Sequence, residues 1–221
     1  MPAEGPLRDR NGPGFELIET LRREPETGFL RLDRHMARLA ASARDLGFSC
    51  DTDKAVQALE NAAAGATTAL RMRLLLRHDG TVTATAQPFR PLPEDEFWRV
   101  RLARTTLSHH DILLRHKTTQ RELYERARAE YSAADADEVL LRNERGEVCE
   151  GTITTLFADF GNGILVTPRI DCGLLAGVLR AELIDEGRAV EGVIPASALS
   201  SALTLYVGNS LRGLVRATFL S

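Results

Sequence analysis

Residues 138–157 read Glu-Val-Leu-Leu-Arg-Asn-Glu-Arg-Gly-Glu-Val-Cys-Glu-Gly-Thr-Ile-Thr-Thr-Leu-Phe. The polar Asn-Glu-Arg-Gly segment at 143–146 is typical of a turn, and it joins two predicted strands at residues 138–142 and 147–149. By the same criteria, further strands are expected at residues 15–22, 28–32, 67–77, 81–86, 98–103, 153–160 and 164–167, around Val193, and at 203–208. Strands and helices alternate irregularly with several hairpins. This pattern favours an α+β fold over a doubly wound parallel sheet.

Helices are predicted where apolar side chains recur at spacings of three and four residues. The first is expected to begin at Asp33 as its N-cap and to end at Gly47. The second runs from about Asp53 to Ala64. Two more are expected from about Gln120 to Tyr131 and from Gly177 to near Gly187.

Two proline-rich segments divide the chain. Residues 1–13 combine glycine and proline with charges, which is typical of a flexible leader. The acidic and proline-rich segment 88–96 is expected to leave the first sheet and cross to a second unit. We therefore expect a leader at 1–14, a small N-terminal α+β domain at 15–104, and a larger C-terminal α+β domain at 105–221 that carries Lys117.

Bulk charge and hydropathy exclude several classes of function. The net charge is −3, and arginines are interspersed with acids, which argues against a nucleic-acid partner. No apolar stretch approaches the roughly 18 residues that a membrane helix needs, and the N-terminus has no signal-peptide hydrophobic region. We expect a cytoplasmic protein with a small-molecule substrate and no membrane partner.

Cysteine and histidine lack the spacing of metal ligands. Cys50, Cys149 and Cys172 include no Cys-x-x-Cys pair, so neither a disulfide framework nor a zinc site is indicated. His109 and His110 have no cysteine or acid at a ligand spacing, so we interpret them as part of a loop. The sequence therefore predicts no metal site.

Lysine is rare in this chain. Lys54 and Lys117 are two of 28 basic residues, and the other 26 are arginines. Arginine cannot lose its proton at ordinary pH, so only a lysine can act as an amine nucleophile. Lys54 lies at the polar start of a predicted helix and is interpreted as a surface charge. Lys117 follows the apolar run 112–114 among other cations, which leaves a surface charge and a reactive neutral amine equally open.

Several motifs occur together and in order. They are His116-Lys117-Thr-Thr-Gln-Arg121, the stretch 143–157, Thr167-Pro168, Cys172-Gly-Leu-Leu-Ala-Gly-Val-Leu-Arg180 and Tyr206-Val-Gly-Asn-Ser210. As a set they resemble the class IV aminotransferase family, the pyridoxal-phosphate enzymes of fold type IV, which include branched-chain and D-amino-acid aminotransferases and aminodeoxychorismate lyase. Residues 15–22 and 35–43 resemble the family's N-terminal half, so the likeness runs from about residue 15 to the end. It implies a two-domain fold with pyridoxal 5'-phosphate as cofactor.

The resemblance implies catalytic roles for two residues. Lys117 matches the lysine that forms the Schiff base with the cofactor. Glu150 matches the glutamate that faces the pyridine nitrogen and keeps it protonated, so that the ring can accept carbanion charge. Without the resemblance, Glu150 would be interpreted as a surface acid beside a turn.

The resemblance also implies residues that bind the cofactor phosphate. Val178 and Leu179 open a helix and would donate backbone N–H groups. Many relatives have a hydroxyl residue where this chain has Leu179, so its side chain is not expected to contribute. Asn209 and Ser210 match a second phosphate-binding turn. The remaining cofactor-binding residues that the resemblance implies are Arg38, which helical periodicity alone would place on a solvated face, and Thr154.

Substrate carboxylates could be recognised by arginine, which offers a bidentate fork. Arg121 is the preferred candidate for substrate binding. Arg180, Arg212 and His116 are alternatives, and each is equally well interpreted as a structural or surface charge.

Within the family, Lys117-Thr-Thr-x-Arg121 with Tyr124, and the stretch ending Glu150-Gly-Thr-Ile-Thr, most resemble aminodeoxychorismate lyase and the lyase-like C-terminal domain of fused aminodeoxychorismate synthase component I. This likeness implies conversion of 4-amino-4-deoxychorismate to 4-aminobenzoate and pyruvate, a step of folate biosynthesis. Two alternatives stay open. One is an aminotransferase acting on a branched-chain or D-amino acid, and the other is a non-catalytic protein that kept the fold.

Two departures from the family pattern bear on the substrate pocket. Thr155 stands where relatives have an asparagine. The chain also begins almost directly at the strand 15–22, so the N-terminal domain is expected to be shortened, without the first strand and loop of most relatives. The resemblance further implies a homodimer.

Overall fold

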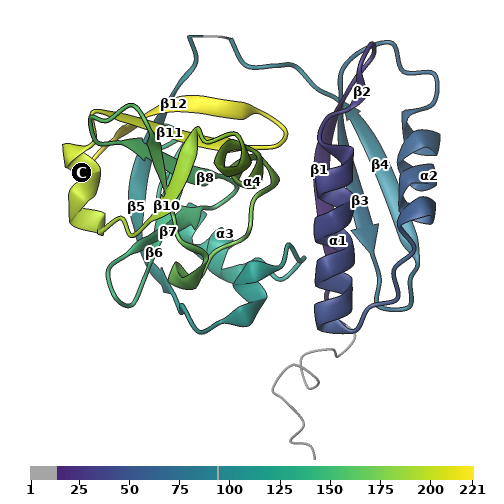
Figure 1. Cartoon of the computed structure of the whole chain (residues 1–221), viewed down its shortest axis with the longest axis horizontal. Coiled ribbons are helices and arrows are strands. Elements are labelled where there is room, and N and C mark those ends of the chain that lie inside the picture. The colour runs from purple at the N-terminus through teal and green to yellow at the C-terminus, as the bar shows by residue number, and fades with distance from the viewer. Residues whose placement is uncertain (1–13, 94) are drawn as a thin grey trace, which may run out of the picture. The chain divides into compact units, whose positions relative to one another are not determined.

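The computed structural model describes residues 14–93 and 95–221. The leader predicted at 1–14 lies, except for Gly14, outside these residues. Contacts divide the chain into two units, one made of residues up to Arg90 with Lys117–Gln120, and the other of Pro91–His116 with Arg121–Ser221 (Figure 1). Within the described residues, no helix combines the length and the hydropathy needed to cross a bilayer.

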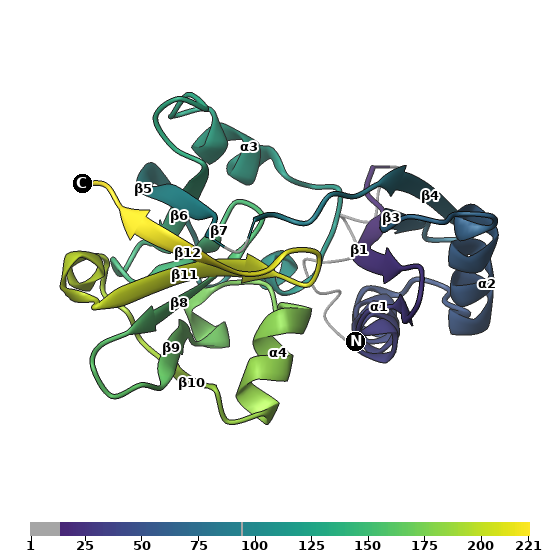
Figure 2. The same cartoon turned by 90° about the horizontal axis from the view of Figure 1, so that it is seen from above.

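The first unit is an antiparallel sheet covered by two helices. The strand order is β2-β1-β3-β4, and α1 packs on β1 while α2 packs on β3 and β4, so both helices cover one face of the sheet (Figure 2). The predicted strand pairs and both helices of this half are confirmed. Their bounds are β1 Leu17–Glu24, β2 Gly28–Phe29, α1 Leu32–Leu46, α2 Thr52–Ala63, β3 Leu70–Leu76 and β4 Val82–Pro88.

The C-terminal end of α1 is the one predicted from its local residues, but its N-terminal end is not. Gly47 adopts a φ of 76° and its N–H bonds the Ala43 carbonyl, which closes α1 as predicted. At the other end, Asp33 is not the N-cap. It lies in the first turn, and the N-cap is Arg31, whose φ of 59° is left-handed and whose side chain makes no capping bond. Only Leu30 and Arg31 separate β2 from α1, so the helix begins directly after the hairpin.

A buried carboxylate connects the sheet to α1. Glu19 of β1 is 1% exposed and accepts hydrogen bonds from Arg38 Nε at 2.9 Å and Nη2 at 2.6 Å, and contacts His35 Nδ1 at 2.6 Å. Burial alone would raise the pKa of Glu19, but the charge of Arg38 and the hydrogen bonds of His35 and Arg38 outweigh it and bring the pKa to about 2. The carboxylate is therefore an ionised part of the core.

This carboxylate predicts an acid-dependent stability. The folded pKa of about 2 lies below the ordinary value of 4.5, so the stabilisation is complete above pH 4.5 and is lost as pH falls toward 2. The shift corresponds to about 3 kcal/mol. We expect Glu19→Gln to flatten the pH dependence of the urea midpoint between pH 5 and 3. Glu60→Gln, on the exposed surface of α2, should leave that dependence unchanged; an equal effect of both variants would contradict the assignment.

The segment that carries Lys117 belongs to the first unit. Ile18 N donates to the Lys117 carbonyl at 2.8 Å, and Thr119 N donates to the Glu16 carbonyl at 3.0 Å. Residues 117–119 therefore extend the sheet beside β1. This differs from the expected domain division, which placed Lys117 in the C-terminal domain.

The boundary between the units also differs from the expected one. It falls between Arg90 and Pro91 and not after residue 104, because β5 pairs in parallel with β12 and β6 of the second sheet. Once a strand contributes its backbone hydrogen bonds to one sheet, it belongs to that unit whatever its position in the sequence.

The second unit is built on a mixed eight-stranded sheet of order β10-β9-β8-β11-β12-β5-β6-β7. Helix α3 packs on β5 and β6, whereas α4 packs on β10 and β11, so the helices lie over different halves of the strand order (Figure 2). The element bounds are β5 Phe97–Leu107, η2 Ile112–Arg115, α3 Glu122–Arg128, β6 Glu138–Asn143, β7 Val148–Gly151, β8 Thr155–Asp159, β9 Leu165–Pro168, η3 Ile170–Cys172, α4 Val178–Asp185, β10 Ala189–Gly192, η4 Ala196–Ser201, β11 Thr204–Asn209 and β12 Gly213–Phe219.

The predicted elements of this half are present with two corrections. The helix expected over 120–131 spans only Glu122–Arg128, and its start is displaced because residues 117–119 pair with the start of β1. The final strand β12 was not predicted; it pairs with β11 on one side and β5 on the other. The hairpin over 138–149 is confirmed.

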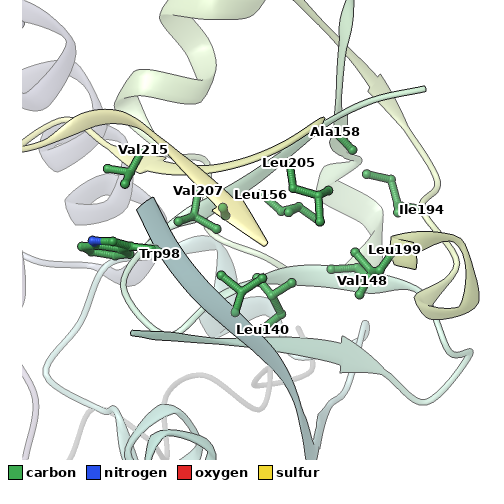
Figure 3. Close-up of a cluster of buried hydrophobic side chains, with 12 residues drawn as sticks. Trp98, Leu140, Val148, Leu156, Ala158, Ile194, Leu199, Leu205, Val207 and Val215 are labelled. Atoms are coloured by element: carbon green, nitrogen blue, oxygen red, sulfur yellow. The ribbon is translucent and has the colours of Figure 1, made fainter. Parts of the chain in front are cut away.

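Apolar side chains from both ends of this unit share one core. Figure 3 shows Trp98 of β5 and Leu140 of β6 converging with side chains of β7, β8, β11 and β12. The fully buried members of this cluster include Val100, Leu140, Val148, Leu156, Ala158 and Val207. Burial of this apolar surface, at roughly 25 cal/mol per Å², holds together strands that are more than 100 residues apart in sequence.

Candidate active site

Glu150 lies on β7, opposite Leu141 of β6, and is 6% exposed. Its Oε1 accepts a hydrogen bond from the Tyr124 hydroxyl at 2.7 Å and another from the Leu175 backbone N–H at 3.3 Å. A buried carboxylate needs such donors to stay ionised. The structure therefore contradicts a solvated surface role for this residue and places a fixed acceptor inside the second unit.

Tyr124 projects from α3 toward this carboxylate. Burial raises the pKa of Tyr124 well above its ordinary value of 10, and the negative charge of Glu150 raises it further. The phenol therefore keeps its proton at neutral pH and remains a hydrogen-bond donor to Glu150. The guanidinium carbon of Arg121 lies over the ring of this tyrosine, 4.7 Å from the ring centroid.

The loop after Glu150 is organised by Glu138, a residue that the sequence analysis did not single out. Glu138 is 1% exposed and accepts from Thr152 N at 3.0 Å, Thr152 Oγ1 at 2.5 Å, Ile153 N at 3.1 Å and Thr154 Oγ1 at 2.8 Å. A Cβ at Gly151 would lie 2.8 Å from Glu138 Oε2. Glycine is therefore needed for the loop to fold over the carboxylate.

We expect Glu138→Ala to lower the free energy of unfolding by about 3 to 5 kcal/mol, because it leaves several buried donors without an acceptor. Chemical denaturation monitored by the fluorescence of Trp98 would measure the change. Glu125→Ala, on the exposed face of α3, is the matched control and should shift stability by less than about 0.5 kcal/mol. A similar small effect of both substitutions would contradict this role of Glu138.

The N-terminus of α4 lies next to the same loop. Gly177 is the N-cap and makes no side-chain capping bond, and a Cβ there would lie 2.8 Å from Thr155 Oγ1. The first N–H groups of the helix are thus not capped by a side chain at this position. Leu179 is 4% exposed and packs with Phe157 and Leu183. Its side chain is part of the core, so Leu179 can offer a ligand only its backbone.

Asn209 and Thr154 have structural tasks in this region. The Asn209 amide donates to the Ile153 carbonyl at 3.1 Å, and its Oδ1 accepts from Leu211 N at 3.1 Å and Arg212 N at 3.0 Å. Thr154 donates its hydroxyl to Glu138. Both side chains hold loops together, so their cofactor contacts remain a prediction. Ser210 follows Asn209 directly and is 6% exposed.

The arginines proposed to bind carboxylates are held by the protein. Arg121 Nη2 donates to the Thr152 carbonyl, and Arg180 Nη2 donates to the Pro168 carbonyl at 2.9 Å and to Glu191. Arg212 lies over the Trp98 ring at 5.6 Å. These contacts favour structural roles, and Arg121 as a substrate ligand stays a prediction.

Arg38 and Lys117 belong to the first unit. The Arg38 side chain is 13% exposed because it is paired with Glu19, so the solvated position that helical periodicity alone indicates is wrong. The polar side of α1 faces a buried acid, and helical periodicity cannot show this. Lys117 is anchored through its own backbone carbonyl to β1.

Contacts within the second unit bring most of the predicted residues into one region. Glu150 bonds Leu175, Gly177 lies against Thr155, Asn209 bonds Ile153, and a Cβ at Gly208 would lie 2.9 Å from Leu179. This region joins a buried carboxylate to the start of a helix whose N-cap, Gly177, makes no side-chain capping bond. Tyr124 and Glu138 complete this region. The one sequence signal for Glu138 was that it is a charged residue at the start of an apolar strand.

The architecture is that of the fold type IV pyridoxal-phosphate enzymes. A 4-amino-4-deoxychorismate lyase structure from Pseudomonas aeruginosa superposes with a TM-score of 0.81, at 25% identity over 93% of this chain and 83% of that one. Residues 16–219 match the family model of class IV amino-transferases. The chain therefore belongs to the class IV aminotransferase family, whose members are pyridoxal-phosphate-dependent lyases and aminotransferases.

Two further relatives carry different provisional names. A Mesorhizobium loti structure provisionally named an amino-acid aminotransferase shares 59% identity and a TM-score of 0.92, over 94% of this chain and 100% of that one. A Schizosaccharomyces pombe protein provisionally named an aminodeoxychorismate lyase is 28% identical over 86% of this chain and 84% of its own length. The chain is thus similar to both kinds of enzyme.

Proposed function

We propose that this chain is a pyridoxal-phosphate-dependent lyase that converts 4-amino-4-deoxychorismate to 4-aminobenzoate and pyruvate. The observation that carries the use of this cofactor is the buried Glu150 with its two donors, Tyr124 and Leu175. The choice of a lyase is supported by the names of the Pseudomonas aeruginosa and Schizosaccharomyces pombe relatives, together with the motif Lys117-Thr-Thr-x-Arg121.

The donor set fits the proposed cofactor. Glu150 offers a buried carboxylate to the ring nitrogen, and Val178 and Leu179 offer backbone N–H groups to the phosphate at the start of a helix whose N-cap, Gly177, makes no side-chain bond. We propose that the phosphate binds to these N–H groups, and the family resemblance implies Asn209, Ser210, Thr154 and Arg38 as further contacts. When bound, the cofactor supplies an acceptor for the electrons left by a broken C–H bond.

Lys117 is proposed to move the protons of the reaction. Its Nζ amine takes the proton from the amine-bearing carbon of the substrate ring, which becomes aromatic as the ether C–O bond to the enolpyruvyl group breaks. The same amine returns a proton to the departing enolpyruvyl group, which becomes pyruvate. One proton is removed and one is returned, so the elimination needs no oxidant and no water.

A second candidate is an aminotransferase of the same class acting on a branched-chain or D-amino acid. The relative from Mesorhizobium loti, at 59% identity, favours it. The assigned cofactor contacts would serve either reaction. The difference is that an aminotransferase passes the amino group to a 2-oxo acid, whereas the lyase releases pyruvate without an amino acceptor.

The discriminating experiment incubates the purified, pyridoxal-phosphate-loaded protein with aminodeoxychorismate and measures pyruvate and 4-aminobenzoate. Equal amounts of both products, absent from a Lys117→Ala variant, are expected. Amino transfer from a panel of amino acids to 2-oxoglutarate, without release of 4-aminobenzoate, would support the second candidate. Absence of both activities from a protein that binds the cofactor would overturn both proposals.

We further propose a cytoplasmic homodimer, as the family resemblance implies. Light scattering coupled to size-exclusion chromatography should give a mass of twice 24.3 kDa. A monomeric mass at the concentration of the activity assay would contradict the dimer.

Tyr124→Phe is expected to lower kcat by about tenfold, because it removes one hydrogen bond to a charged carboxylate, worth roughly 1.5 kcal/mol, and leaves Leu175 N–H in place. Steady-state release of pyruvate measures the effect. Tyr131→Phe is the matched control, since the Tyr131 hydroxyl donates to the Leu102 carbonyl at 2.9 Å and does not reach Glu150. Equal losses in both variants would indicate a general effect of losing a hydroxyl.

A further inference from the structure

Two adjacent histidines and an acid distant in sequence meet at one edge of the second unit. His109 Nδ1 contacts Glu144 Oε1, and the His109 backbone N–H donates to Glu144 Oε2 at 3.2 Å. The ring centroids of His109 and His110 lie 3.7 Å apart at an interplanar angle of 39°. The atoms of these three residues that can bind a metal all lie within 4.8 Å of one another.

The sheet topology explains this meeting. Strands β5 and β6 are parallel neighbours, and Leu107 near the end of one pairs with Asn143 at the end of the other. The residues that follow two parallel strands leave the sheet at the same edge. His109 and Glu144 are therefore brought together although 35 residues separate them, which is why no ligand spacing is visible in the sequence.

The turn that presents Glu144 is held in place by its neighbours. Asn143 Oδ1 accepts from Arg145 N at 2.9 Å and Glu147 N at 3.1 Å, and Asn143 Nδ2 donates to the Cys172 carbonyl at 3.0 Å. The next cation, Arg145, is engaged with Glu147 and with the Asp171 carbonyl. The carboxylate of Glu144 is thus presented by a fixed turn whose arginine is directed to other partners.

The histidine segment is fixed as well. Gly173 has a φ of 88°, and a Cβ at that position would lie 2.8 Å from the His109 Cα. The backbone of 172–173 therefore packs directly on His109, and the Asn143 bond to Cys172 connects it to the Glu144 turn. Three loops are therefore joined around the cluster through their backbones, and the side chains of His110 and Glu144 are exposed to solvent.

We propose that His109, His110 and Glu144 form a binding site for a divalent transition metal of the zinc type. Two imidazole nitrogens and one carboxylate are a donor set that zinc accepts in proteins, with water completing the coordination. Imidazole ligands also select against magnesium and calcium, which prefer oxygen donors only. The site uses none of the residues assigned to pyridoxal phosphate, so it does not depend on the proposed reaction.

The test is equilibrium dialysis of the purified protein against zinc chloride, followed by metal analysis. One zinc per chain is expected, and His110→Ala and Glu144→Gln should each weaken binding by at least tenfold. Neither variant touches a residue of the proposed active site. His78→Ala is the matched control, because this exposed histidine packs on Phe48 in the first unit, and it should bind zinc as the wild type does.

Cobalt(II) titration separates this site from binding by cysteine or by the cofactor. Visible bands without thiolate charge-transfer absorption, lost in His110→Ala, would support the proposal. Zinc stoichiometry below one, or affinity unchanged in both His110→Ala and Glu144→Gln, would overturn it. Thermal melting of each variant without metal checks that the loss of binding is not a loss of fold.

Discussion

Lys117→Ala is expected to reduce turnover of aminodeoxychorismate by on the order of 10⁴-fold, because it removes the one group proposed to take and return the proton. The substitution should not unfold the protein. The bonds that anchor this segment to β1 come from the backbone carbonyl of Lys117 and from Thr119, and alanine keeps the former.

The chain provides its own control for this experiment. Lys54 is the other lysine; its side chain is 76% exposed on α2, where it pairs with Asp51. Lys54→Ala should retain full activity. After borohydride reduction of the loaded protein, mass spectrometry should find the cofactor fixed to the wild type and to Lys54→Ala, and not to Lys117→Ala. Fixation that persists without Lys117, or turnover that survives its loss, would rule out the proposed role.

Local chemistry made much of this fold predictable. The turn at 143–146 could be predicted from its own residue types. Asn143 Oδ1 accepts hydrogen bonds from the N–H groups of Arg145 and Glu147, and these bonds form the turn. Gly47 ends α1 for an equally local reason. Features that depend on four or five consecutive residues can be deduced from a single sequence.

Features that depend on distant pairing could not be predicted in this way. Strand β12 was not predicted, and the structure places it by its pairing with β11 and β5. The helix predicted from residue 120 loses its start because residues 117–119 pair with β1, about 100 positions earlier in the chain. Apolar periodicity does not carry this information.

The candidate site shows the same division. Lys117 and Glu150 were proposed as site residues from residue type and family motifs, whereas the partners that hold Glu150 were not predicted. Tyr124 is 26 residues away from it, and Leu175 contributes a backbone N–H that has no sequence signature. Glu138 was missed because an acid at the start of an apolar strand is usually interpreted as a solvent-exposed strand end. Its burial follows from the five hydrogen bonds that its carboxylate accepts, and the sequence does not show these.

Glu150→Gln is expected to lower kcat by about 10²- to 10³-fold, the usual cost of removing one preorganised charged group from a reaction centre. Glutamine is close to glutamate in shape, and its amide oxygen can still accept from Tyr124 and Leu175. The fold should therefore persist, and the loss should lie in kcat, since the charge is proposed to act on the reacting centre. Glu125→Gln, on the exposed face of α3, removes the same charge elsewhere and should leave kcat unchanged.

The same variant has a readout that does not involve the cofactor. The charge of Glu150 raises the pKa of Tyr124 in addition to the effect of burial, so Glu150→Gln should lower that pKa while burial still keeps it above the ordinary value. An ultraviolet titration of tyrosinate should show one residue ionising at lower pH than in the wild type. Loss of activity without this shift in the pKa of Tyr124 would show that the catalytic role of Glu150 does not depend on its contact with Tyr124. A shift without loss of activity would leave the carboxylate as a structural partner of α3 and remove it from the catalytic proposal.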